Sequence, residues 1–118
     1  MKRPAKPSKF LNIKTVVDGF EFASKKEARR YSELRILEKA GEIRDLQLQP
    51  RFPFKVNDVS VCTYVGDFSY IINPKPGDQH VGTYVLEDVK SAITRKDPVY
   101  RIKNKLFKAV MGFEITEV

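Results

Sequence analysis

Carboxylates inside two apolar stretches constrain the fold of this chain more than any other feature of its sequence. The first stretch contains Gly66-Asp67-Phe68, and the next contains Glu87-Asp88-Val89-Lys90. Both stretches have the composition of buried β-strands, and burying an unpaired carboxylate costs several kcal/mol. A chain that carries such acids on two successive strands, with a lysine close behind the second, must neutralise them. We therefore expect a bound metal ion at this place.

The length and composition indicate one folded domain. The chain has 118 residues, of which 42% are hydrophobic and 11% aromatic, enough for a single modest core. No apolar run approaches the roughly 20 residues of a membrane span, and the N-terminus lacks the apolar region of a signal peptide. The chain has one cysteine, Cys62, so it cannot form an internal disulfide. One cysteine and one histidine, His80, are too few for a zinc site. We therefore expect a cytoplasmic protein that is not associated with a membrane.

The net charge of +7 is concentrated in two segments. Residues 1–9 hold four basic residues, two prolines and no acid, which indicates a flexible basic arm in front of a domain at 10–118. Between Lys90 and Lys108 there are seven basic residues and one acid. This excess favours a polyanionic partner such as DNA, although a solvated surface explains the charge equally well. The candidate DNA contacts are Lys2, Arg3, Lys6, Lys9, Arg95, Lys96, Tyr100, Lys103 and Lys105.

Capping signals predict two helices. Ser24-Lys25-Lys26-Glu27 is a capping-box pattern, and the helix that it begins should run to Ala40, with Gly41 as its stop. Asp97-Pro98 predicts the N-cap and first residue of a second helix, which should end at Gly112. The expected core-facing residues are Ala28, Tyr31, Leu34 and Leu37, with Ile36 as a further candidate, and then Ile102, Leu106, Phe107 and Val110.

Alternating apolar residues predict strands between and after these helices. Asp18-Gly19 indicates a hairpin over residues 10–22. Pro50 and Pro53 indicate that the first main strand is bent or lies at an edge. The expected main strands are Ile43–Val56, Val59–Ile72, Thr83–Val89 and Phe113–Val118. The predicted order is therefore helix, three strands, helix, strand, in the α/β class.

Strand alternation separates the acids of the third strand. Asp88 and Lys90 share a face with Leu86, whereas Glu87 points the other way, where we expect it to face solvent. If the second and third strands pair antiparallel, Asp67 approaches Asp88 at one end of the sheet. Two such carboxylates repel each other unless a cation lies between them, and Mg²⁺ or Mn²⁺ prefers oxygen ligands of this kind. Taken alone, the Asp-x-Lys spacing is also common on ordinary surface strands.

The combined pattern resembles the PD-(D/E)xK nuclease superfamily. More narrowly, it resembles a small phage and prophage family of predicted nucleases similar to Holliday-junction resolvases. The resemblance covers residues 20–118 and is carried by Phe22–Tyr31, Leu46–Phe52, Tyr64–Phe68 and Glu87–Lys90. It implies a restriction-endonuclease-like core, αβββαβ, with a mixed central sheet flanked by helices. Gly66 stands where the superfamily's namesake proline is found.

The resemblance also implies roles for individual residues. Asp67 and Asp88 match the metal-binding acids, Lys90 matches the motif lysine, and Glu27 matches an acid that binds metal or positions water. Gln49 matches a residue that lines some of these sites. The implied activity is Mg²⁺- or Mn²⁺-dependent hydrolysis of phosphodiester bonds in junction or branched DNA. Glu27 and Gln49 each have an alternative to the role that the resemblance implies. Glu27 is also explained as the partner in a capping box, and Gln49 as a hydrogen-bond partner of nearby backbone.

Two other functions are compatible with the sequence. One is a catalytically inactive nuclease-fold protein that binds a host protein or nucleic acid, and the other is a basic structural protein whose acids form salt bridges. Retention of Asp67, Asp88 and Lys90 favours the enzyme, because a pure binder has no need for two facing carboxylates. Resolvases act as dimers, so the resemblance also implies a homodimer, and a phage origin implies the host cytoplasm.

Overall fold

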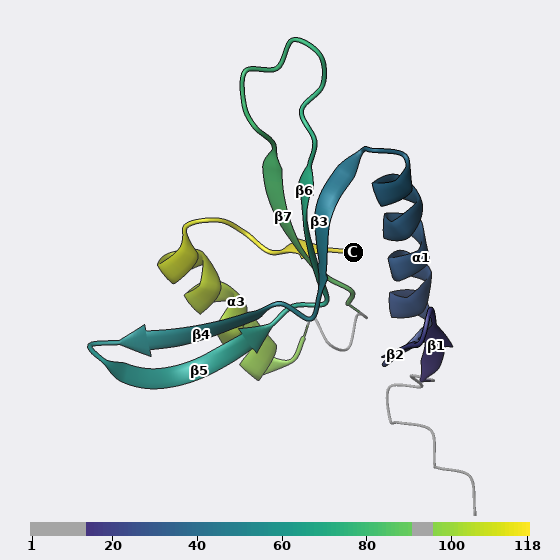
Figure 1. The fold of residues 1–118 in the computed structure, drawn as a ribbon. Helices are drawn as coiled ribbons and strands as arrows, with labels where there is room; N and C mark the ends of the chain where they lie inside the picture. The colour runs from purple at the N-terminus through teal and green to yellow at the C-terminus, as the bar shows by residue number, and fades with distance from the viewer. Residues whose placement is uncertain (1–13, 91–95) are drawn as a thin grey trace, which may run out of the picture.

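A four-stranded mixed sheet lies between helices α1 and α3 in the computed structural model, which describes residues 14–90 and 96–118 (Figure 1). The strand order is β3-β6-β7-β8. Strands β3 (Ile43–Leu48) and β7 (Thr83–Asp88) pair antiparallel with β6 (Phe68–Ile72), and β8 (Thr116–Glu117) pairs parallel with β7. The expected α/β class, with a mixed sheet and flanking helices, is confirmed.

The N-terminal hairpin and α1 form where local signals predict them. Strands β1 (Thr15–Val17) and β2 (Phe20–Phe22) meet at a turn, which confirms the described part of the hairpin. Ser24 caps α1 (Lys25–Lys39) by accepting a hydrogen bond of 3.1 Å from the N–H of Glu27. The chain leaves the helix at Gly41, whose φ of +80° favours glycine.

Both long strands expected between the helices are interrupted, so the prediction of continuous strands was wrong. The first divides at Gln49-Pro50 into β3 and β4 (Arg51–Val56), and the second divides at Gly66-Asp67 into β5 (Val59–Val65) and β6. Gln49 has a φ of +51° and Pro50 lacks an N–H, so the chain turns there instead of continuing the ladder. Strands β4 and β5 pair with each other as a ribbon that extends away from the sheet (Figure 1).

The main sheet nevertheless keeps the predicted sequence of elements. Around it the chain runs α1, β3, β6, β7, α3, β8, with the β4–β5 ribbon inserted between β3 and β6. Helix α3 (Pro98–Met111) begins behind its N-cap Asp97 and ends at Gly112, as predicted. Across the described residues, no helix is long and apolar enough to cross a membrane.

Two hydrophobic clusters fix the helices on opposite faces of the sheet. The cluster under α1 consists of Phe22, Ala28, Tyr31, Leu34, Ile43, Phe68 and Tyr70. The cluster under α3 joins the ribbon to β7 and consists of Phe54, Tyr64, Leu86, Tyr100, Phe107 and Ile115. Each fully buried large apolar side chain contributes about 1.5–3 kcal/mol. Ile36, Ile102 and Val110 are exposed, so these three predictions of core residues were wrong.

Side chains alternate across β7 as predicted. Leu86 lies in the α3 cluster, whereas Val85 and Val89 pack against the α1 cluster. Asp88 therefore faces the α3 side of the sheet, and Glu87 faces α1. Both acids lie at the end of the sheet from which the ribbon leaves, and the long β6–β7 connection projects from the opposite end (Figure 1).

Candidate functional site

The acids singled out in the sequence converge where β7 ends and where β6 and α1 begin. Asp67 directly precedes β6, Asp88 is the last residue of β7, and Glu27 lies in the first turn of α1. The side chains of Asp67 and Asp88 are close enough to interact, and the charges of Glu27 and Asp88 both act on Asp67. Lys90 completes the group, with its Nζ 3.4 Å from Oδ2 of Asp88. These four residues are called the acid cluster below.

Asp88 is held from several elements at once. The hydroxyl of Tyr64, in β5, donates a hydrogen bond to Oδ2, the same oxygen that faces Lys90. The backbone of Asp88 accepts a hydrogen bond of 2.8 Å from the N–H of Val118, at the C-terminal end of the chain. The ammonium of Lys90 lies 4.0 Å from the ring centroid of Tyr100, a cation–π contact that fixes it beside the acid.

Negative charge in the acid cluster exceeds what its lysine neutralises. Burial raises the pKa of Asp67 to about 7, and repulsion by Glu27 and by Asp88 adds to the rise. The N–H of Val89 donates to Oδ2 of Asp67 at 2.7 Å and opposes it. Burial, followed by repulsion from Asp88, also raises the pKa of Glu27, while Lys90 works in the opposite direction. A cation entering here would displace a proton near neutral pH.

Glu27 lies both in the capped first turn of α1 and at the acid cluster. Its N–H donates to the side chain of Ser24, and its carboxylate interacts with the backbone of Ala23, the residue before the N-cap, which lowers its pKa. The same residue is buried and lies within electrostatic reach of Asp67 and Asp88. Capping therefore positions the carboxyl of Glu27 at the acid cluster and does not exclude it from the site.

The donor chemistry fits a hard divalent cation. In the part of the chain that the structure describes, no three His, Cys, Asp or Glu side chains are already arranged to hold a metal ion. Mg²⁺ usually keeps several waters, however, and takes only one or two protein carboxylates together with substrate phosphate. Asp67 and Asp88 are enough for that mode of binding. Asp67 also forms no ion pair with any of the described residues, so its charge has no partner of its own.

Glu87 is a buried structural ion, so the prediction that it faces solvent was wrong. Its side chain is 1% exposed. Nε and Nη2 of Arg30 donate to its two carboxylate oxygens at 2.8 and 2.6 Å, and the hydroxyl of Tyr70 donates as well. Burial and the hydrogen bond to Glu87 raise the pKa of Tyr70 to about 12, so its hydroxyl remains a donor. Glu87 is thus neutralised by its own partner and stays apart from the acid cluster.

Gln49 and Gly66 lie where the chain bends beside the acid cluster. Gln49 lines a cavity of about 260 Å³ together with Glu27 and Asp67, and its N–H donates to the backbone of Asp67 at 3.0 Å. A Cβ on Gly66 would lie 2.6 Å from Cδ1 of Leu86, closer than atoms approach in packed structures. Glycine at position 66 is therefore explained by close packing against Leu86 of β7.

The candidate DNA contacts are distributed unevenly. Lys103 lies beside Lys90 in a second cavity of about 260 Å³, and its Nζ donates to the backbone of Thr63 at 3.1 Å. Tyr100 is 8% exposed and supports Lys90 from beneath. The side chains of Lys96 and Lys105 are exposed. The remaining candidates lie outside the described residues, and they are Lys2, Arg3, Lys6, Lys9 and Arg95.

Two residues at the site were not found from the sequence. Tyr64 contacts Asp88, and Arg30 neutralises Glu87, but each partner lies far away along the chain. Tyr64 carried no signal, because a tyrosine in an alternating strand is also an ordinary core residue. For Arg30 a partial signal existed, since an acid such as Glu87 in an apolar run requires a cation from another element.

The fold and the site define a mixed α/β domain with a carboxylate-rich centre at one end of its sheet. A family described as "Protein of unknown function (DUF1064)" matches residues 7–115, so the chain belongs to this family. Neither a curated protein nor a solved structure matches the chain. The family description assigns no activity, and the geometry of the acid cluster is the evidence that bears on function.

Proposed function

We propose that this chain is a metal-dependent DNA endonuclease with a restriction-endonuclease-like core. The observation that carries the proposal is the meeting of Asp67, Asp88 and Lys90 at one end of the sheet, where Asp67 forms no ion pair within residues 14–90 and 96–118. The order α1, β3, β6, β7, α3, β8 and the mixed sheet support the resemblance to PD-(D/E)xK nucleases. We propose junction or branched DNA of phage-type replication as the substrate.

Each residue of the acid cluster has a distinct part in this proposal. Asp67 and Asp88 would hold Mg²⁺ or Mn²⁺, which supplies charge for the scissile phosphate and an activated water. Lys90 is fixed beside Asp88 and over Tyr100, where its ammonium neutralises charge that grows on the phosphate. The raised pKa of Glu27 allows it to hold or accept a proton at the same place.

The surface on the α3 side of the acid cluster supports DNA binding. Lys90 and Lys103 line one cavity there, and Lys96 and Lys105 lie exposed on the same part of the chain. Cations arranged in this way hold backbone phosphates without reading bases. This agrees with selection of DNA by its structure instead of its sequence.

The test is cleavage of labelled four-way-junction, single-stranded and linear duplex DNA in Mg²⁺, Mn²⁺ or EDTA. We expect cleavage of the junction in either metal and none in EDTA, with a loss of at least about 100-fold in Asp88→Asn. Asp45→Asn is the matched control, because it removes the same charge from an exposed strand residue with positive φ, which asparagine tolerates. Absence of cleavage by the unmodified chain in both metals, or full activity in Asp88→Asn, would overturn the proposal.

A binding protein without catalysis is the second candidate. Two observations favour it: no three potential ligands are arranged to hold a metal among the described residues, and Tyr64 and Lys90 already contact one oxygen of Asp88. The same experiment separates the two functions, with binding measured in Ca²⁺ beside cleavage. Tight binding of DNA without cleavage in any metal supports this candidate, and a host protein becomes the expected partner if DNA does not bind at all.

A further inference from the structure

We propose that the cavity beside Gln49 binds one unpaired nucleobase of the DNA strand whose neighbouring phosphate lies at Asp67 and Asp88. This inference rests on the proposed function, since it takes the strand to pass the acid cluster. The cavity has a volume of about 260 Å³ and lies where the β1–β2 hairpin, the first turn of α1 and the end of β3 meet. It is therefore a separate pocket that shares one edge with the acid cluster.

The two sides of this base pocket differ in chemistry. One side is apolar and aromatic, formed by Phe20, Phe22 and Leu48. The other carries Gln49, with Glu27 and Asp67 at the edge shared with the acid cluster. Phe20 is 48% exposed, so among the described residues about half of its surface remains open for contact with a base. A flat apolar ring with an amide and acceptor oxygens around it matches a nucleobase, which offers a π-face and an edge of amino and carbonyl groups.

Electrostatics select a base over a phosphate in this pocket. Within the described residues its lining includes no lysine or arginine, and Glu21 joins the two acids already named. A phosphate would be repelled there, whereas a neutral base with amino donors is accepted. The cavity on the α3 side has a more basic lining, with Lys90 and Lys103 in its wall beside one acid, Asp97. The acid cluster thus stands between a pocket suited to a base and one suited to a phosphate, as a strand threaded past it requires.

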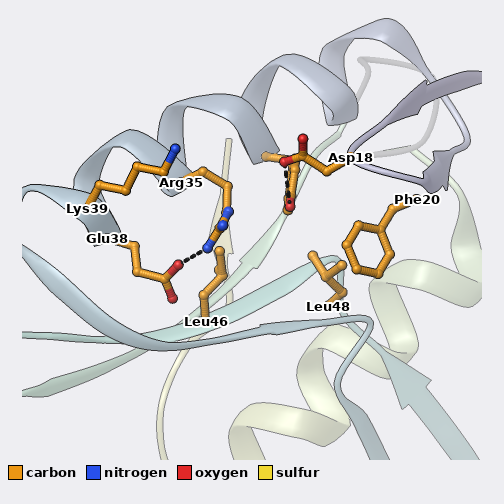
Figure 2. A pocket seen from close by; sticks show the side chains of 8 residues that line it. Asp18, Phe20, Arg35, Glu38, Lys39, Leu46 and Leu48 are labelled. Atoms are coloured by element: carbon orange, nitrogen blue, oxygen red, sulfur yellow. Dashed lines mark hydrogen bonds and ion pairs between the residues drawn. The ribbon is translucent and has the colours of Figure 1, made fainter.

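The position of Phe20 is set by its neighbours. Its ring packs edge-on against Tyr31, with centroids 5.9 Å apart and an interplanar angle of 60°. Phe20 and Leu48 also form one end of a larger cavity of about 480 Å³ along α1, and Figure 2 shows these two side chains next to each other. Farther along α1 that cavity is lined by Lys39 and by Arg35, which forms an ion pair with Glu38. Lys39, which is exposed, is therefore at hand for the phosphate that follows the inserted base.

Base entry restricts the substrate to DNA with an unpaired nucleotide. In an intact duplex each base is stacked and paired, so it must first be extruded, and this step is easiest where the base is already unpaired. Branch points, bulges and single strands supply such a base. The pocket therefore gives a physical cause for selection of branched DNA, which the acid cluster alone does not.

The test uses a labelled duplex with a one-nucleotide bulge and the same duplex with an abasic bulge, titrated in Ca²⁺. We expect the unmodified chain to bind the base-containing bulge about tenfold more tightly, the ratio that stacking on one aromatic ring produces. Phe20→Ala and Gln49→Gly should each reduce this ratio to about twofold or less. Glycine is chosen because Gln49 has positive φ, so its side chain is removed without backbone strain. Val16→Ala, which truncates an exposed residue of the same hairpin, should retain the tenfold ratio.

The outcomes separate this inference from the proposed function. A ratio near one in the unmodified chain, or an unchanged ratio in both Phe20→Ala and Gln49→Gly, overturns the base pocket even if junction DNA is cleaved. A tenfold ratio that both variants lose supports the pocket even if cleavage is absent, since the titration needs no chemistry. No binding to either bulged duplex refutes the pocket, and the junction-cleavage assay then decides the endonuclease by itself. Circular dichroism of each variant identifies any that fails to fold, and the other variant then decides.

Discussion

Removal of Arg30 should destabilise this chain more than removal of any neighbouring surface charge. Arg30→Ala leaves Glu87 in place, 1% exposed, and among the described residues its carboxylate then keeps the hydroxyl of Tyr70 as its one side-chain hydrogen-bond donor. Removing one member of a buried ion pair costs about 3–5 kcal/mol. The side chain of Arg30 is itself 22% exposed, so water partly replaces it, and we expect the lower end, about 3 kcal/mol. In a domain of this size that lowers Tm by roughly 10–20 °C.

Urea unfolding at pH 7, followed by circular dichroism, measures this change in the free energy of unfolding. Arg29→Ala is the matched control, because it removes the same side chain from the adjacent, exposed position of α1 and should stay within about 0.5 kcal/mol. Arg30 also pairs with the exposed Glu33 at 2.9 Å, an i,i+3 contact that contributes only about 0.2–0.5 kcal/mol. Glu33→Ala measures that contribution so that it can be subtracted.

Substitution of the other member of the ion pair, Glu87, should have a smaller effect on stability. Glu87→Gln should be less harmful than Arg30→Ala, because the amide stays hydrogen-bonded to Tyr70 and Arg30 turns its unmatched charge toward water. Glu87→Gln should also leave DNA cleavage in place, since Glu87 lies on the α1 face and apart from Asp88. Equal, small effects for Arg30→Ala and Arg29→Ala would refute the view of Glu87 as a structural ion. Glu87 would then return as a candidate for the acid cluster.

Three further predictions follow from the same geometry. In EDTA, the raised pKa of Asp67 means that the folded chain binds a proton more tightly than the unfolded chain, so stability is lost as pH rises from about 4 to about 7. Asp67→Asn should therefore have a higher Tm than the unmodified chain at pH 8, and the difference in Tm should be smaller at pH 4. Addition of Mg²⁺ at pH 8 should raise the Tm of the unmodified chain but not that of Asp67→Asn. Gly66→Ala should lower the free energy of unfolding by about 1–3 kcal/mol in urea melts, because its Cβ meets Leu86. Lys103→Ala should weaken the binding of all DNAs alike, because it removes one phosphate contact. In titrations between roughly 50 and 200 mM salt, the slope of log K against log salt should become smaller by about 0.9.

The helix ends were predictable from the sequence because their causes are local. A capping side chain lies three or fewer residues from the N–H that donates a hydrogen bond to it. Ser24 accepts from Glu27 in this way, and Asp97 accepts from Val99. The placement of Asp88 and Glu87 on opposite faces of the sheet was predictable for a similar reason, since alternation of side chains is a property of one strand. The site residues that follow from these rules were brought together as expected.

Features that depend on distant parts of the chain were not predictable in the same way. A strand broken at Gln49-Pro50 has the same alternation as a continuous one, so the sequence did not show that β4 leaves the sheet. The contact of Tyr64 with Asp88 exists because Tyr64 lies at the base of the ribbon, close to where the chain passes from β5 into β6, the strand that pairs with β7. The outer face of α3 stays exposed at Ile102 because α3 packs on this narrow ribbon and on Leu86, not on a broad sheet.

The two neighbouring acids of β7 show why burial alone does not mark a functional residue. Glu87 and Asp88 are equally inaccessible, yet Glu87 has a bidentate arginine of its own, whereas Asp88 shares its one lysine with Glu27 and lies against Asp67. A fold selected for stability alone would gain by giving every buried acid a cation, as it does for Glu87. Among the described residues, the acid cluster combines three carboxylates with one lysine. A site built to receive a metal cation from outside requires this deficit of positive charge, and we infer from the proposed function that the deficit serves that purpose.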